Sequence, residues 1–313
     1  MSGDSLDLGM QEFVGEVDFS GNEEEGVEQE VSSRILTRDE ASKCLCNLGK
    51  IDSGLGYAYL SIKASDMGLT DISVIPCFRN VIYVDVSGNR LTPDAMSVLT
   101  SMTFLLMLQA DRNGLPTGSM EPMLYLQVLT LNRNNITNTT GISHKLLECL
   151  ELNYNGIKNV SLNPYLLKNL KILELRGNAI SGMGGIYCPT LVRLYLAENW
   201  LTIIEGLETL VNLSVLHIRA NKIEVLDGFE NPHSCPKLTY LNLRNNCLRG
   251  MDEIRKLRYL VKLESLIIME NNLDMGEESA YRIPVLRILP NLKRIDKDPV
   301  LEDERVEASD ILQ

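Results

Sequence analysis

The segment "NLKILELRGNAI", residues 169–180, contains the pattern that decides the fold. Leu170, Leu173 and Leu175 lead to Asn178, and the alternation around Leu173 and Leu175 is typical of a β-strand. An amide buried at the end of a strand costs free energy unless it finds hydrogen-bond partners. The pattern therefore predicts that a neighbouring part of the chain supplies partners for Asn178.

The same order of residues recurs about every 22 residues, which is the period of a leucine-rich repeat. Ten segments follow the order Leu-x-x-Leu-x-Leu-x-x-Asn-x-Leu, with Val, Ile or Ala at some Leu positions, and Met67 occupies the first Asn position. The others hold Asn89, Asn113, Asn134, Asn155, Asn178, Asn199, Asn221, Asn246 and Asn271. In stacked units each amide can donate to and accept from the backbone of neighbouring units. We therefore predict an α/β fold: a curved leucine-rich-repeat solenoid of about ten repeats with a parallel concave β-sheet and a structural asparagine ladder.

The N-terminal residues 1–34 differ from the rest in charge. They contain ten acidic residues and one basic residue, Arg34, and so carry −9 of the net charge of −12. We expect an acidic, disordered arm that either contacts a partner or only solvates the chain. Neither this arm nor the rest of the chain has the cationic character needed to neutralise phosphates, so we expect no nucleic-acid partner.

The remaining chain divides into caps and repeats. Residues 35–53 are predicted to form an N-terminal cap helix, because Thr37 and Glu40 fit a capping box and helical spacing continues to Leu48 before Gly49 ends it. Leucine-rich repeats are expected over 54–288. Residues 289–313 are expected to form a C-terminal cap, in which Ile295-Asp296 replaces the Asn frame and a short helix runs from about 301 to 312.

Other classes of function lack sequence signals. No apolar run is long enough for a membrane span, and the N-terminus lacks the features of a secretory signal. Seven scattered cysteines favour reduced thiols in the cytoplasm. The three histidines are scattered, and no nucleophile motif or phosphate loop is present. We expect no enzyme activity, catalytic residue, cofactor, metal, membrane or small-molecule substrate.

The concave sheet is the candidate protein-binding face, because residues next to the buried leucines point outward. The column before the second leucine of each repeat is apolar in seven of nine units, and arginines gather in the later units. The candidate residues are Tyr83, Met107, Val128, Ile172, Arg176, Tyr195, Val215, His217, Arg219, Tyr240 and Arg244. We expect the three arginines to bind carboxylates of a partner.

Two points stay open at this stage. The apolar stripe either binds a partner or is partly covered by the rim of the chain itself. Trp200, which follows Asn199, either anchors a partner at the edge or packs against Lys222 of the next unit.

The start of the repeat region resembles a known family. The stretches "GLGYAYLSIKASDMGLTDISVI" at 54–75, "YVDVSGNRLT" at 83–92 and "RIDK" at 294–297 are similar to those of the leucine-rich repeat-containing protein 23 family. The resemblance covers roughly residues 35–305 and departs from the family in the acidic arm and the short C-terminal end. It implies a non-enzymatic scaffold in the head region of the third radial spoke, located in the cytoskeleton of the cilium or flagellum axoneme. Its partners would be other radial-spoke proteins, and its role would support motility.

Two other scaffold functions remain open. The frame of "LYLAENWLTIIEGLETLVNL" at 194–213 is similar to Sds22-like repeats, which implies a regulatory subunit of a protein phosphatase. A ribonucleoprotein scaffold is the third alternative.

Overall fold

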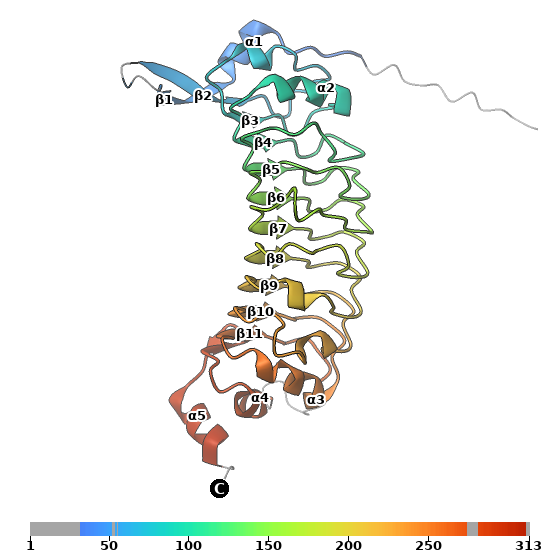
Figure 1. Cartoon of the computed structure of the whole chain (residues 1–313), viewed down its shortest axis with the longest axis vertical. Coiled ribbons are helices and arrows are strands. Elements are labelled where there is room, and N and C mark those ends of the chain that lie inside the picture. The colour runs from blue at the N-terminus through green and yellow to red at the C-terminus, as the bar shows by residue number, and fades with distance from the viewer. Residues whose placement is uncertain (1–31, 52–53, 55, 274–280, 311–313) are drawn as a thin grey trace, which may run out of the picture. The chain divides into compact units, whose positions relative to one another are not determined.

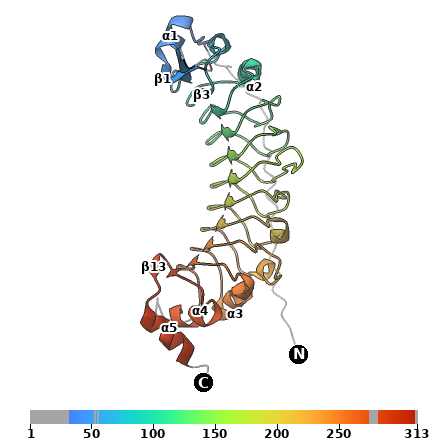
Figure 2. The same cartoon turned by 60° about the vertical axis from the view of Figure 1, so that its left-hand side comes forward.

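The computed structural model describes residues 32–51, 54, 56–273 and 281–310. Residues 33 onward form one unit, in which short coils stack along a single axis (Figure 1). Each coil places one short strand on the concave side and returns along the opposite side, as Figure 2 shows. Residues 1–31 of the predicted acidic arm lie outside the described part of the chain, and so do residues 311–313 at its end.

The described sheet has 13 strands whose spatial order follows their order in the chain. The parallel strands are β2 (Tyr57–Lys63), β3 (Tyr83–Asp85), β4 (Met107–Gln109), β5 (Val128–Thr130), β6 (Cys149–Glu151), β7 (Ile172–Glu174), β8 (Arg193–Tyr195), β9 (Val215–His217), β10 (Tyr240–Asn242), β11 (Ser265–Ile267) and β12 (Arg294–Ile295). Two antiparallel strands, β1 (Leu45–Lys50) and β13 (Asp298–Pro299), close the ends. The predicted leucine-rich-repeat solenoid is confirmed.

The described parts of the return segments contain only short helices. They are α2 (Pro93–Ser97), α3 (Gly250–Arg255), α4 (Arg282–Ile288) and single 3-10 turns at Ile75–Cys77, Val98–Ser101, Leu207–Thr209, Asp227–Phe229 and Lys256–Tyr259. Residues 102–206, all of them described, contain no helix. Leucines of the repeat frame, such as Leu173, Leu194 and Leu216, are fully buried between the sheet and the return segments. Their burial is the main apolar contribution to the stability of the stack.

The asparagine ladder forms as predicted. The Asn178 side chain donates to the carbonyl oxygens of Leu152 and Leu175, at 3.0 and 2.9 Å, and accepts from the amide of Ile157 at 3.1 Å. Each rung thus joins its own coil to the preceding one, and the other eight asparagines make equivalent bonds. At the first position, Met67 contributes only its backbone amide, which donates to Asn89 at 3.1 Å.

The N-terminal cap corrects one prediction. Helix α1 (Arg38–Lys43) has the predicted capping box between Thr37 and Glu40, but it ends at Lys43 rather than at Gly49. Leu45–Lys50 instead form β1, which pairs antiparallel with β2 and opposes Leu48 to Tyr59. The predicted extent of the helix was wrong because helical spacing does not show that the first parallel strand needs a partner for its open edge. Strand β1 supplies that partner.

In the C-terminal cap, a carboxylate accepts from the amides that follow β11. Asp296 Oδ1 accepts from the amides of Ile268 and Met269, at 2.7 and 2.9 Å, and Tyr281 donates its hydroxyl to Oδ2 at 2.5 Å. For Ile268, Asp296 therefore replaces the strand carbonyl to which the equivalent amide donates in earlier coils, as the amide of Leu243 does to the carbonyl of Ile267. Helix α5 (Glu302–Ser309) follows within the range expected for the final helix.

Three further observations bear on function. None of the described helices has the length and apolar content to cross a bilayer. All seven cysteines lie in the described part of the chain, and each is a free thiol. Within that part, no group of three or more His, Cys, Asp or Glu side chains could hold a metal ion.

Candidate protein-interaction face

The predicted columns of the concave face are real lines of neighbouring residues. The strand register aligns Tyr83 with Met107, Met107 with Val128, and so on to Ser265. Tyr83 is 38% exposed, whereas Met107, Val128, Ile172, Val215 and Tyr240 are half-buried. Strands about 4.8 Å apart shield each other's side chains, so a partner would contact the stripe as one surface.

A hairpin extends this stripe beyond the first coil. Leu48, Tyr57 and Tyr59 are 62%, 63% and 48% exposed, on a hairpin that projects from the stack (Figure 1). Tyr57 and Tyr59 share a strand face with Ser61, which pairs with Tyr83. The alternation of tyrosines at 57 and 59 was the sequence signal for these residues. Sequence analysis missed the hairpin because residues 45–50, which pair with the strand that contains Tyr57 and Tyr59, were predicted to be helical.

A second ladder of hydrogen bonds lies on the face itself, in the third column. Here each side chain accepts from the backbone amide of the third-column residue in the next coil. The pairs are Ser87 with Asp111 at 3.2 Å, Asp111 with Asn132 at 2.7 Å, Asn132 with Asn153 at 2.8 Å and Asn153 with Arg176 at 2.8 Å. This surface ladder was not predicted, although its run of short polar side chains is visible in the sequence. It ends at Arg176, whose side chain has no acceptor atom.

Carboxylates dominate the first half of the face. Glu151 and Glu174 lie opposite each other on β6 and β7. Burial raises the pKa of Glu151, a hydrogen bond from Asn132 lowers it, and the charges of Glu174 and Asp111 raise it. Burial and these glutamates also raise the pKa of the Cys149 thiol to about 12, so that it stays protonated and a poor nucleophile at neutral pH.

The arginines of the second half already have partners. Arg176 and Arg219 both form salt bridges with Glu198 Oε1, at 2.7 and 2.9 Å, and Arg244 pairs with Glu270. A partner's carboxylate would therefore have to compete with Glu198 or Glu270. Sequence reasoning missed these glutamates, which precede ladder asparagines. Both glutamates have a left-handed backbone conformation, with φ of 56° at Glu198 and 59° at Glu270.

Three aromatic side chains form a row across β8, β9 and β10 in the second half of the face. His217 stacks on Tyr240 with ring centroids 6.2 Å apart and planes 8° apart, and Tyr195 lies 6.0 Å away on the other side. Burial, helped by Arg219 and Arg176, lowers the pKa of His217 to about 4, so the imidazole is neutral at pH 7. Asn242 lies 2.9 Å from its Nε2 atom. The row is a neutral aromatic shelf suited to contact rather than to proton transfer.

Trp200 makes no ring contact with this shelf. Its side chain is 56% exposed, and its ring makes no stacking or cation–π contact with Lys222 or any other described residue. Its proposed role as an edge contact stays a prediction.

The stacked coils and their amphipathic sheet define a leucine-rich repeat protein. The Leucine Rich repeat family model matches residues 234–250. The chain is 41% identical to the bovine leucine-rich repeat-containing protein 23 over 282 residues, which cover 90% of this chain and 81% of the bovine one. The human protein of that name is also 41% identical, over 89% of this chain and 80% of its own. The chain belongs to the leucine-rich repeat-containing protein 23 family.

Two weaker similarities add to this. The mouse cilia- and flagella-associated protein 410 is 33% identical over 97 residues, 31% of this chain and 38% of its own. Among solved structures, an internalin (inlF) of Listeria monocytogenes has a TM-score of 0.52 at 19% identity, covering 82% of this chain and 89% of that one. The internalin shows a shared fold only.

Proposed function

We propose that this chain is a non-enzymatic scaffold of the radial spoke in motile cilia and flagella, in the head region of the third spoke. Its concave face and hairpin bind neighbouring spoke subunits. The observation that carries the proposal is the apolar surface formed by the exposed Tyr57, Tyr59 and Tyr83 and continued by the half-buried residues of the first column. Large exposed apolar surfaces on soluble folds are typical of protein-binding sites.

Two other features support a scaffold. The buried and surface ladders join successive coils, so the face is preformed and loses little conformational entropy when it binds. The family membership and the partial similarity to a cilia- and flagella-associated protein favour the axoneme as its location.

The test is a triple substitution, Tyr83→Asp, Ile172→Asp and Tyr240→Asp, expressed in ciliated cells that lack the native protein. The proposal predicts that the variant is lost from detergent-extracted axonemes, because three carboxylates would be placed in an apolar contact. The control carries Tyr165→Asp, Ile203→Asp and Val306→Asp, at exposed positions outside the columns, and should be retained. Thermal unfolding must show that both variants fold.

Equal retention of the two variants would contradict the use of the concave face. If the native chain is found wholly outside the axoneme, the spoke assignment itself fails. A phosphatase catalytic subunit that co-purifies with the chain and changes activity on binding would favour the Sds22-like alternative.

A further inference from the structure

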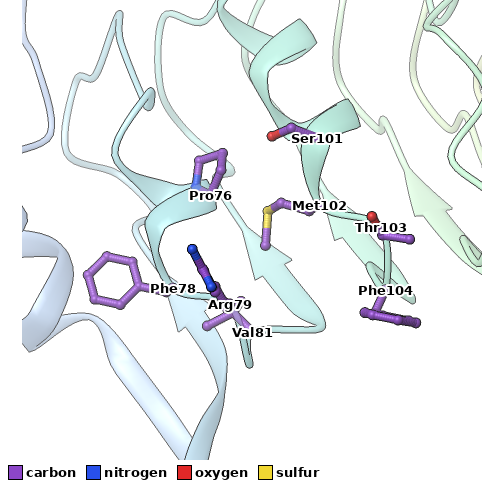
Figure 3. Close-up of a pocket in the computed structure, with 8 residues that line it drawn as sticks. All are labelled: Pro76, Phe78, Arg79, Val81, Ser101, Met102, Thr103 and Phe104. Carbon is purple, nitrogen blue, oxygen red and sulfur yellow. The ribbon is translucent and has the colours of Figure 1, made fainter.

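A second surface lies on one flank of the solenoid, formed by the residues just before each strand. In the early coils it is apolar: Phe104, Leu124, Tyr125 and Leu146 are 61%, 65%, 43% and 37% exposed. The rings of Phe104 and Tyr125 lie 5.6 Å apart. Figure 3 shows Phe104 on one side of a hollow and Phe78 on the other, with Met102 and Arg79 between them.

From the next coil onward the same flank is basic. A groove crosses five coils and is lined by Lys168, Asn169, Lys171, Thr190, Val192, Asn212, Ser214, Lys237, Thr239 and Lys262. Four of these ten residues are lysines and none is acidic, in a chain whose net charge is −12. The lining of the groove therefore has a charge opposite to that of the whole protein. Glu264, the acidic residue just before β11, forms a salt bridge of 2.8 Å with Lys293.

Carboxylates of the chain leave most of this charge uncompensated. Lys171 forms a salt bridge of 2.9 Å with Glu148, and Lys237 Nζ donates to the neutral amide of Asn212 at 2.6 Å. Lys168 and Lys262 form no salt bridge with any residue that the structure describes. Uncompensated ammonium groups on neighbouring coils attract an anionic ligand, and more strongly at low ionic strength.

The floor of the groove is held in place by its own hydrogen bonds. Asn169 donates to the carbonyl of Lys145 and Asn212 to that of Pro189, each at 2.8 Å. Thr190 donates to the carbonyl of Leu170, also at 2.8 Å. These bonds tie each coil to the one before it, so the lysines project from a preformed surface, which lowers the entropic cost of binding.

We infer that this flank binds an extended acidic peptide segment of a partner protein, with apolar residues at the end that lies against Leu146. The groove spans four strand spacings, about 19 Å, which an extended chain covers in about six residues. The lining of the groove contains no arginine and no aromatic ring. It therefore lacks the stacking platform typical of single-stranded nucleic-acid sites, which favours carboxylates over a polynucleotide. The inference concerns a surface separate from the concave face and does not rest on the proposed function.

The experiment measures binding of a fluorescein-labelled peptide, two leucines followed by six glutamates, to the full chain at low and high salt. The variant K168E/K262E reverses the two lysines without a described salt bridge. Its control, K158E/K222E, makes the same change in net charge at exposed positions that do not line the groove. We expect the groove variant to weaken binding about tenfold or more and the control to change it about twofold or less, because only close charges act strongly on the ligand.

A peptide with serines in place of the glutamates should not bind. Equal affinity of the two variants, or no binding by the wild-type chain, would overturn the inference. A single-stranded oligonucleotide that displaces the peptide at equal concentration would overturn it in favour of nucleic acid. The combined variant Phe104→Ser and Leu146→Ser should lose the preference for the leucine-containing peptide over plain hexaglutamate. An unchanged preference would contradict the apolar part of the proposal.

Discussion

Two ladders of side-chain hydrogen bonds run along this solenoid, and they differ in their access to water. The inner ladder consists of nine asparagines, such as Asn178, most of which are buried. The surface ladder runs from Ser87 to Arg176 on the concave face, where residues such as Asn153 are half-buried. Both use short polar side chains to join successive coils. Because water can replace a lost partner only on the face, the inner ladder should determine stability and the surface ladder should organise a binding surface.

The largest expected effect is that of Asn178→Leu. This change removes one acceptor from the amide of Ile157 and two donors from the carbonyls of Leu152 and Leu175. The amide of Ile157 is left without a partner, which costs about 1–3 kcal/mol. The two carbonyls keep Asn155 and Asn199 as donors, so each of these lost bonds costs only about 0.5–1.5 kcal/mol, and the total loss of stability should be about 3 kcal/mol or more. Urea unfolding followed by circular dichroism measures it. An unchanged unfolding midpoint would show that the inner ladder does not stabilise the stack.

The second effect depends on pH and concerns His144, which is fully buried behind the sheet. Its Nδ1 accepts from the amide of Met123 at 3.1 Å, and burial lowers its pKa from 6.5 to about 4. Between these values the unfolded chain binds more protons than the folded one, so stability falls as the pH falls. The full contribution is about 3 kcal/mol.

Unfolding midpoints measured from pH 7 to pH 4 test this. His144→Leu should reduce the slope in that window by about half, because His217, whose pKa is also about 4, contributes a similar share. The variant should also be less stable at pH 7, because the amide of Met123 is left without an acceptor. The exposed His233→Leu serves as the control and should keep the wild-type slope. A slope for His144→Leu equal to that of the wild type would mean that another group causes the acid sensitivity.

The smallest effect completes the comparison. Asn153→Leu makes the same chemical change as Asn178→Leu but on the face, where it removes the bonds to the amide of Arg176 and to Glu174. Water can reach these groups, so the expected loss of stability is about 1 kcal/mol or less. If urea unfolding gave equal losses for the two variants, solvent access would not be what distinguishes the ladders.

Sequence reasoning succeeded where one residue type has one role in every coil. The nine asparagines, the buried leucines and the first-column residues from Tyr83 to Ser265 all lie where the repeat predicted them. It failed at the N-terminal end of the solenoid and for salt bridges between side chains of different columns. Residues 45–50 pair with β2 instead of extending α1, because the open edge of the sheet needs a partner. The salt bridges of Arg176 and Arg219 with Glu198 join different coils, and their geometry depends on the backbone at Glu198.

The sequence by itself determined the period, the identity of the inner ladder and therefore the parallel concave sheet. These follow from local spacing, because a side chain repeated at one position of every coil lies next to the equivalent side chain of the next coil. Only the tertiary structure decided which charges are already paired, where the apolar stripe continues onto the hairpin and that lysines from separate coils form one groove. Those features depend on distances between residues that are remote in the chain, and no local pattern records such distances.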